Sequence, residues 1–413
     1  MTSPTDLVWL DAVQDLLDHS HLWQPEQLAD AVNETATRAG VEATIYQIDH
    51  EQHWLRPLPR RDRPVAERQP VDASLAGRAF TTVKSLPSGG DPPDRWWVPI
   101  VNGTDRLGVV EFSLLDGTAG RQPRLQRRLE MFAGLVGHLL TVTEPRGDHL
   151  QRMRRSRPMS TAAELLLTVL PPLTVSSRGL VVAAVLEPCY EVGGDGYDYA
   201  FNDSTPQVLV LDAVGRGLSA GLACVVVVSA VRAARRAGKT LLEQAEAADA
   251  ALLEQFPDAR FATAVLAELD VERGTLRYIN AGHPPPLLLR AGKLVRELGG
   301  GRRMPLGVHD ESVEIGEETL EPGDRLLIYT DGVTEARAAT GEPFGVERLL
   351  ELVERHSTDG LPAPETLRRL SHAVSDHQEA PPVDDATLLL MEWSPSAVAR
   401  TVPSTVAPEN PEE

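Results

Sequence analysis

Four segments in the C-terminal half of the chain place aspartates beside glycines or at the ends of apolar runs. The aspartates are Asp195, Asp212, Asp331 and the adjacent pair Asp384 and Asp385. The end of a strand is rigid, and a neighbouring glycine lets a ligand or another backbone come close. Converging carboxylates repel one another unless a cation neutralises them. This spacing therefore indicates a site for a divalent cation.

The residue types favour a hard cation that acts on phosphate. Oxygen ligands suit Mg²⁺ or Mn²⁺ better than zinc, and no Cys/His cluster competes with them. A pair of such ions can activate a shared water and bind a phosphoryl group. A single Asp-Gly after a strand is usually only a turn. The hypothesis rests on the four segments occurring in order within one region.

Composition narrows the class of protein and its cellular compartment. The chain has 413 residues, with 40 Lys and Arg against 60 Asp and Glu, which gives a net charge of −20. Such a surface repels nucleic acid and anionic lipid, so we expect neither as a partner. Two cysteines cannot build a disulfide framework, the N-terminus lacks a secretory signal, and no apolar window is long enough to span a membrane. We expect a cytoplasmic protein.

Hydrophobic periodicity and turn residues divide the chain into four parts and predict an α+β fold class. We expect a mixed domain over 5–143, a helical connector over 144–178, a strand-rich domain over 179–393 and a disordered tail over 394–413. Helices are expected at 7–17, 25–39, 124–143, 162–170, 218–237 and 241–255, and hairpins at 96–113 and 261–281.

Five segments of the third part resemble the successive motifs of the metal-dependent Ser/Thr protein phosphatases, the PPM family. They are EVGGDGYDY, LDAVGRGLSAGLA, FATAVLAELDVERGTLRYINAGHPPPLLL, LEPGDRLLIYTDGVTEA and VDDATLLLME. The likeness spans about 180–392 and is greatest to the SpoIIE-type branch of bacterial stress and sporulation signalling. It implies an αββα sandwich of two antiparallel sheets, with two Mn²⁺ or Mg²⁺ ions at one end.

The resemblance also implies roles for individual residues. Asp212 matches the acid that bridges the two metals, with the Ala213 carbonyl as a further ligand. Asp331 matches a second metal carboxylate, and the pair Asp384 and Asp385 matches the last ligand motif, in which Asp384 is favoured. The implied reaction is attack of a metal-bridging water on phosphorus, without a covalent enzyme intermediate.

Asp195 matches the acid of a Gly-Gly-Asp motif, near the metals directly or through water. The chain departs from the family pattern around it. Gly196 stands where the family usually has a bulky aromatic residue, and Leu211 stands where it usually has glycine before the bridging aspartate. Residues 214–217 read Val-Gly-Arg-Gly in place of Ser-Gly-Lys-Gly. These changes bear on substrate fit and packing more than on metal binding.

Other polar residues have alternative interpretations. His283, in Asn-Ala-Gly-His, is expected to be structural rather than a general acid, and Arg216 either contacts a substrate phosphate or is an exposed residue at a helix start. Asp198, Asp203 and Asp324 are expected to be turn acids.

The first part resembles a GAF-type sensor domain in its order of helices and strands, which implies a small-molecule ligand or a homodimer interface. The whole chain is then expected to be a sensor-regulated phosphatase. Its implied substrate is a phosphorylated STAS-type anti-sigma factor antagonist in a partner-switching pathway. Two alternatives remain: a catalytically silent module that binds phosphoproteins, and a phosphatase for small phosphoesters.

Overall fold

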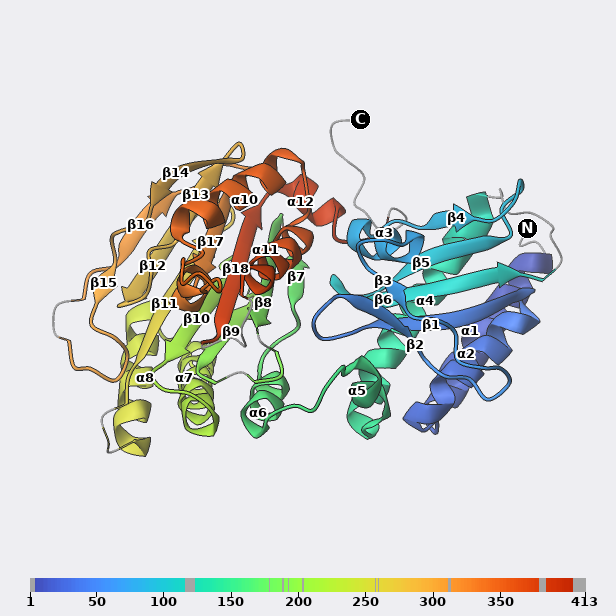
Figure 1. Ribbon diagram of the computed structural model, residues 1–413, viewed down its shortest axis with the longest axis horizontal. Helices are drawn as coiled ribbons and strands as arrows, with labels where there is room; N and C mark the ends of the chain where they lie inside the picture. Colours follow the sequence, from blue (N-terminus) through green and yellow to red (C-terminus); the bar gives the residue numbers. More distant parts are fainter. Residues whose placement is uncertain are drawn as a thin grey trace. The chain divides into compact units, whose positions relative to one another are not determined.

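The computed structural model divides the chain into two compact units, each described here by itself (Figure 1). One unit comprises Met1–Ser156 with Ala399–Glu413, and the other comprises Arg157–Val398. The residues that the structure describes are 4–115, 123–177, 179–187, 189–191, 193–202, 204–256, 258, 260–310, 313–378 and 384–403.

The first unit contains one six-stranded antiparallel sheet in the order β3-β2-β1-β6-β5-β4. Its strands are β1 (Val41–Ile48), β2 (Trp54–Pro57), β3 (Gln69–Pro70), β4 (Leu86–Ser88), β5 (Arg95–Asn102) and β6 (Asp105–Leu114). Its helices are α1 (Pro4–Ser20), η1 (Pro25–Gln27), α2 (Leu28–Arg38), α3 (Leu75–Thr82), α4 (Pro123–Thr143), η2 (Glu144–Arg146) and α5 (His149–Arg154).

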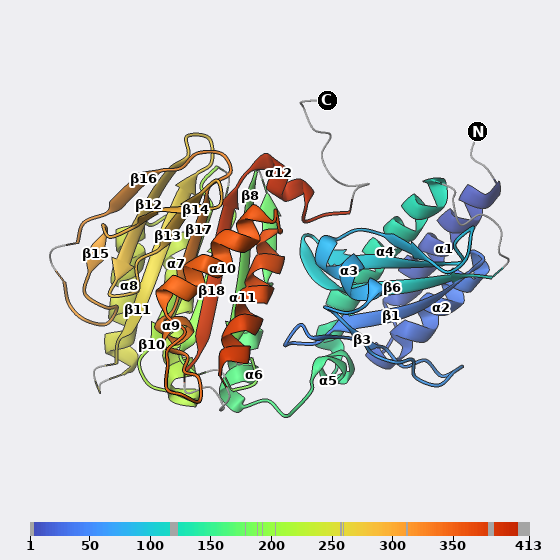
Figure 2. The ribbon, with the colours of Figure 1, turned by 45° about the horizontal axis from the view of Figure 1, so that its top comes forward.

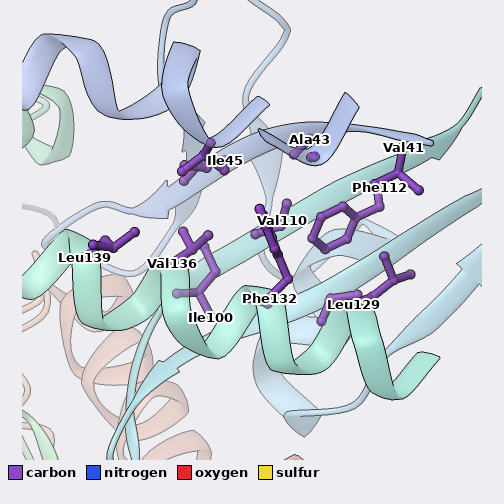
Figure 3. Packing of buried hydrophobic residues seen from close by; sticks show 14 of the residues in the cluster. Val41, Ala43, Ile45, Ile100, Val110, Phe112, Leu129, Phe132, Val136 and Leu139 are labelled. Carbon is purple, nitrogen blue, oxygen red and sulfur yellow. The ribbon is translucent and has the colours of Figure 1, made fainter. Parts of the chain in front are cut away.

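Helices cover both faces of this sheet. The apolar stripe of α4 packs on one face, where Phe132 meets Phe112 of β6 edge to face at 6.0 Å (Figure 3). Helices α1 and α2 complete that side through residues such as Trp9 and Val32. A smaller cluster beneath α3, centred on Phe80, covers the other face.

The second unit is a sandwich of two six-stranded sheets. One sheet runs β15-β12-β11-β10-β9 with β16 beside β12, and the other runs β14-β13-β17-β18-β8-β7. All pairings are antiparallel except the short β12–β15 contact. The strands are β7 (Thr174–Ser177), β8 (Leu180–Glu187), β9 (Asp195–Ala200), β10 (Gln207–Ala213), β11 (Ala262–Asp270), β12 (Thr275–Ala281), β13 (Leu287–Arg290), β14 (Lys293–Glu297), β15 (Arg302–Arg303), β16 (Gly316–Thr319), β17 (Arg325–Tyr329) and β18 (Ala386–Trp393).

Alternation along the strands produces three apolar layers. In β10, Val208 and Val210 point into the core between the sheets, whereas Leu209 and Leu211 point outward against helices. Helices α6 (Thr161–Val169), α7 (Leu218–Arg236) and α8 (Leu241–Gln255) cover this outer face. Helices α9 (Asp331–Glu335), α10 (Val346–Thr358), α11 (Ala363–His377) and α12 (Pro395–Ala399) cover the other sheet (Figure 2). The predicted α+β class and the helix-flanked pair of antiparallel sheets are confirmed.

Helix α7 is long and apolar enough, by length and composition alone, to cross a membrane; it is the one such helix in the part of the chain that the structure describes. In the sandwich it packs against α6, α8 and the strands β9 and β10. A core helix passes the same test of composition, so this helix is weak evidence for a membrane span.

The connector expected over 144–178 is divided between the two units. Helix α5 belongs to the first unit, whereas α6 and β7 are built into the second. The reason is burial, because Ala163 and Leu166 of α6 lie in the core beneath α7, and β7 pairs with β8. The tail expected to be disordered begins with α12, where Ala397 is buried, and residues 404–413 lie outside the described residues.

The turn interpretation of Asp198 was wrong. Asp198 lies within β9, is buried, and receives hydrogen bonds from the guanidinium groups of Arg232 at 2.7 Å and Arg235 at 2.8 Å. These ion pairs fasten α7 to the sheet. Asp324 does precede β17 at a turn, where it pairs with Arg290, and Asp203 lies outside the described residues.

Candidate active site

The five predicted aspartates come from both sheets of the sandwich. Asp195 begins β9 and Asp212 lies near the end of β10, and the two are direct cross-strand partners. Asp331 follows β17 as the first residue of α9, and Asp384 and Asp385 come just before β18. Because β17 and β18 are paired, the second sheet delivers its acids from neighbouring strands.

Two sets of hydrogen bonds join the sheets at these aspartates. Oδ2 of Asp385 accepts bonds from the backbone N–H groups of Gly193 at 2.6 Å and Gly194 at 2.7 Å. In the other direction, the Thr330 hydroxyl donates to Oδ2 of Asp195 at 2.7 Å and accepts from the N–H of Thr387 at 2.9 Å. The site is therefore a seam, formed by these aspartates and Thr330, where hydrogen bonds hold the two sheets together.

Glycines make the seam possible because backbones approach closely there. A Cβ on Gly332 would collide with the carbonyl oxygen of Asp385, and one on Gly194 would collide with the carbonyl oxygen of Ala213. The glycines beside the acids therefore serve close packing, as their place in the sequence predicts.

The carboxylates differ in depth. Asp195 and Asp385 are buried, with exposed fractions of 1% and 7%, and Oδ2 of each accepts hydrogen bonds across the seam. Asp212 is half-buried, whereas Asp331 and Asp384 are exposed. The site therefore has an inner pair engaged by the protein and an outer set of three that faces solvent.

Burial and mutual repulsion together raise the pKa values of several carboxyls in the site. Burial, followed by the charges of Asp331 and Asp384, raises the pKa of Asp212 to about 7. Burial and the nearby Asp212 and Asp385 raise the pKa of Asp195 well above its usual range. Burial and Asp384 also raise the pKa of Asp331. Carboxyls whose pKa values rise together in this way are characteristic of functional sites.

The donor set fits a divalent cation. It offers oxygen only, it carries excess negative charge, and its outer members are open to solvent. Among the described residues, no three acidic, histidine or cysteine side chains already converge as a finished ligand shell. An ion would therefore have to draw the outer carboxylates together and offset the repulsion between them.

His283 lies beside the seam rather than among the acids. It is buried, and its Nδ1 is 2.9 Å from the hydroxyl of Thr263, which is the cross-strand partner of Asp212. Burial lowers the pKa of His283 to about 4, so the ring is neutral at physiological pH. A neutral ring that contacts a threonine agrees with a structural role.

Two of the departures from the family pattern face each other. Gly196 and Leu211 are direct cross-strand partners on β9 and β10. A Cβ on Gly196 would meet the sulfur of Cys224 and would lie against Leu170 and Leu211. The bulk expected at position 196 is therefore supplied from the opposite strand and from α7, and the packing is preserved in a different arrangement.

Sequence reasoning missed Thr330 and Cys224. Thr330 is fully buried and connects Asp195 to β18, and Cys224 lies with its sulfur 3.6 Å from the carbonyl oxygen of Asp195. A hydroxyl at the end of an otherwise apolar strand was the available signal for Thr330. No local pattern marks Cys224, because its contact joins a helix to a strand far away in the sequence.

Comparison with known proteins agrees with this architecture. Residues 202–394 match the profile of the family described as Stage II sporulation protein E (SpoIIE). The second unit is thus a domain of the metal-dependent protein phosphatase class. Within that class it belongs to the SpoIIE type.

Curated relatives and a solved structure show the same likeness. The chain is 38% identical over 93 residues to Protein IcfG of Synechocystis, covering 22% of this chain and 15% of that one. It is 22% identical over 233 residues to Phosphoserine phosphatase RsbU of Bacillus subtilis, covering 56% and 68%. The SiaA-PP2C domain of Pseudomonas aeruginosa is 23% identical with a TM-score of 0.49, covering 56% and 94%. The chain thus spans a small part of the first relative and about two thirds of the second.

Proposed function

We propose that the second unit is a Mn²⁺- or Mg²⁺-dependent phosphoserine/phosphothreonine phosphatase. The observation that carries the proposal is the seam of aspartates from both sheets, in which burial and the charges of neighbouring aspartates raise the pKa of Asp212 to about 7. That charge pattern calls for cations. The SpoIIE-type motifs and the likeness to RsbU support the reaction class.

In this proposal the outer residues Asp212, Asp331 and Asp384 hold the metal, together with the Ala213 carbonyl. Two bound ions would supply a water acidic enough to attack phosphorus, and would offset charge on the phosphoryl oxygens. The inner residues Asp195 and Asp385 position the others: Asp385 fixes the loop before β9, and Asp195 fixes Thr330, the residue before Asp331. Direct contact of either with a metal is the alternative for these two residues.

The test is release of phosphate from p-nitrophenyl phosphate with and without Mn²⁺, in wild type and in Asp212→Ala and Asp331→Ala. Metal-dependent activity that disappears in both variants, with folding retained by circular dichroism, is the expected result. Full activity in both variants would contradict the site. A wild type without activity under Mn²⁺ and Mg²⁺ would favour the second candidate, a catalytically silent module that binds phosphoproteins. The motif departures at Gly196 and Leu211 are the observation that favours this candidate.

The proposed physiological substrate is a phosphorylated STAS-type anti-sigma factor antagonist, whose dephosphorylation would release a sigma factor by partner switching. The name of RsbU as a phosphoserine phosphatase supports phosphoserine as the target. Dephosphorylation of such a purified phosphoprotein much faster than of p-nitrophenyl phosphate, compared by kcat/KM, would separate this proposal from a small-phosphoester phosphatase. We place the protein in the cytoplasm, with neither nucleic acid nor membrane as a partner.

The first unit is proposed to be a GAF-like sensor, able to bind a small molecule, that regulates the phosphatase. A single antiparallel sheet with helices on both faces supports this proposal. A variant lacking residues 1–156 is expected to differ from the full chain in kcat or in metal dependence. Identical kinetics would count against regulation by this unit.

A homodimer is proposed through α1 and α4. Leu7, Leu10 and Leu17 of α1 are spaced at intervals of three and seven and are exposed, as are Met131 and Val142 of α4. Apolar residues in such a stripe favour packing against another helix. Light scattering of the wild type should give twice the mass of one chain, and Leu10→Asp should have the mass of a single chain. A monomeric wild type would overturn the proposal.

A further inference from the structure

The loops next to the aspartate seam carry apolar side chains at the surface. β10 ends at Ala213 and β11 begins at Ala262, and these two residues are cross-strand partners. Val214 and Phe261 are therefore neighbours just beyond the strands, joined by a backbone hydrogen bond of 3.0 Å. Their exposed fractions are 39% and 37%, and that of Leu218, at the start of α7, is 46%.

Backbone geometry fixes the shape of this loop. Gly215 and Gly217 have φ angles of +105° and +68°, a region that other residues rarely adopt. They hold Val214 and Leu218 on either side of Arg216, four residues after Asp212. The guanidinium of Arg260 lies alongside Gly215, since a Cβ there would be 3.4 Å from it.

Charge distinguishes this surface from the chain as a whole. The protein carries a net charge of −20, yet two arginines stand beside its most acidic site. Arg260 is paired with Asp258 at 3.3 Å, whereas Arg216 is exposed and makes no ion pair within the described part of the chain. A cation in that position attracts a doubly charged phosphoryl group toward the metal-binding carboxylates.

Exposed apolar residues that occur singly are ordinary, but several in the loops next to one polar site indicate contact with a partner. We propose that Val214, Leu218 and Phe261 form a specificity rim that binds apolar side chains flanking the phosphorylated residue of a protein substrate. Arg216 contacts its phosphoryl group. The inference rests on the proposed phosphatase function and names the sequence that this site selects.

The test uses two synthetic phosphoserine peptides of equal length and net charge. One has leucine and valine at the two positions on each side of phosphoserine, and the other has serine and threonine there. Wild type with Mn²⁺ is expected to give a kcat/KM about tenfold higher for the apolar peptide. In Leu218→Ser and Phe261→Ser the ratio should fall below about threefold. A ratio taken within one variant cancels any general loss of activity.

Val295→Ser is the matched control. Val295 lies on β14 of the other sheet, is 50% exposed, and is expected to leave the peptide ratio at its wild-type value. Binding of fluorescent forms of both peptides to Asp212→Ala, followed by anisotropy, should show the same preference without turnover. Arg216→Gln should weaken both phosphopeptides equally and should not change their ratio.

The outcomes distinguish failure of the specificity rim from failure of the proposed phosphatase function. Equal kcat/KM for both peptides in wild type, or a ratio unchanged in Leu218→Ser, overturns the rim even when p-nitrophenyl phosphate is hydrolysed. If neither the peptides nor p-nitrophenyl phosphate is hydrolysed with Mn²⁺ or Mg²⁺, the phosphatase function fails, and the inference falls with it.

Discussion

Both units contain deeply buried aspartates, and two of them, Asp49 in the first unit and Asp195 in the second, are used in opposite ways. Asp49 of the first unit has no exposed surface, accepts hydrogen bonds from the N–H groups of His53 and Trp54, and lies 3.7 Å from Arg56. Asp195 of the second unit is as deep, yet its strongest electrostatic neighbours are Asp212 and Asp385.

The difference lies in the neighbours rather than in the burial. Burial raises the pKa of both carboxyls, but backbone N–H groups and Arg56 oppose the rise at Asp49, whereas further acids add to it at Asp195. A buried aspartate with donors around it closes a turn. A buried aspartate among other aspartates marks a place that a cation completes.

The largest expected effect comes from removing one of the clustered acids of the second unit. Asp212→Ala should lower Mn²⁺-dependent phosphate release about a thousandfold or more, because it removes the carboxylate that interacts with all four of the other acids. The measurement is initial rate with p-nitrophenyl phosphate across a Mn²⁺ titration. Rates within tenfold of wild type at saturating Mn²⁺ would show that Asp212 is not at the centre of the site.

The same carboxyl should make metal-free stability depend on pH. Its pKa rises from 3.8 to about 7 on folding, so the native state holds the proton more tightly than the unfolded state. Stability is therefore lost as the pH rises from about 4 to about 7. The advantage of Asp212→Asn over wild type in free energy of unfolding should grow by roughly 1–3 kcal/mol across that range.

Urea unfolding in EDTA measures this effect, and saturating Mn²⁺ supplies the control. With the metal bound, wild type should become the more stable of the two proteins, because the ion replaces the missing positive charge. A difference between wild type and Asp212→Asn that does not vary with pH would mean that the pKa of Asp212 is not raised in the folded chain.

Gly332→Ala should disrupt the seam without removing a charge. The added methyl group would meet the carbonyl oxygen of Asp385, so we expect a loss of roughly 1–3 kcal/mol in the free energy of unfolding of the second unit. Gly299→Ala is the control, because a Cβ there has nothing within 4 Å. Equal stability of both variants would show that the backbones are not packed as described.

Asp49→Ala tests the other side of the comparison, in which hydrogen-bond donors surround the buried carboxyl. It leaves the N–H groups of His53 and Trp54 without their acceptor, so the free energy of unfolding of the first unit should fall by about 1–3 kcal/mol, which thermal unfolding measures as a lower midpoint. Phosphate release by the second unit should persist. Loss of metal-dependent activity as severe as in Asp212→Ala would erase the distinction between the two aspartates.

The smallest effect concerns packing beside the seam. Gly196→Ala brings a methyl group against the sulfur of Cys224 and should cost about 1–2 kcal/mol. Adding Cys224→Ala removes that contact and should recover part of the loss, which a double-mutant cycle measures as a coupling between the two sites. Purely additive effects would place Cys224 away from Gly196.

Much of the fold could be predicted from local patterns. The hairpin expected at 261–281 is found as β11 and β12, and the apolar spacing at 218–237 and 241–255 marks α7 and α8. The connector was harder to assign. Helix α6 packs in the second unit because α7 covers it, and the sequence around α6 contains no information about that contact.

The candidate site shows the same limit. The types and order of the aspartates were available from the sequence, and the structure brings them to one seam. Their division into an inner and an outer set was not, since it depends on Thr330 and on the N–H groups of Gly193 and Gly194. Asp198 resembled its neighbours in sequence, yet Arg232 and Arg235 of a distant helix give it a structural use.

The facing pair Gly196 and Leu211 has a consequence for how this lineage can change. Because the space above Gly196 is filled by Leu211 of the facing strand and by Cys224, position 196 can gain bulk only if these neighbours lose it. Homologues should therefore carry small–large or large–small combinations at these positions and avoid large–large ones. Substitutions would have to arrive together or through a small–small ancestor, so the pair should appear in alignments as a coevolving signature that distinguishes subgroups of the family.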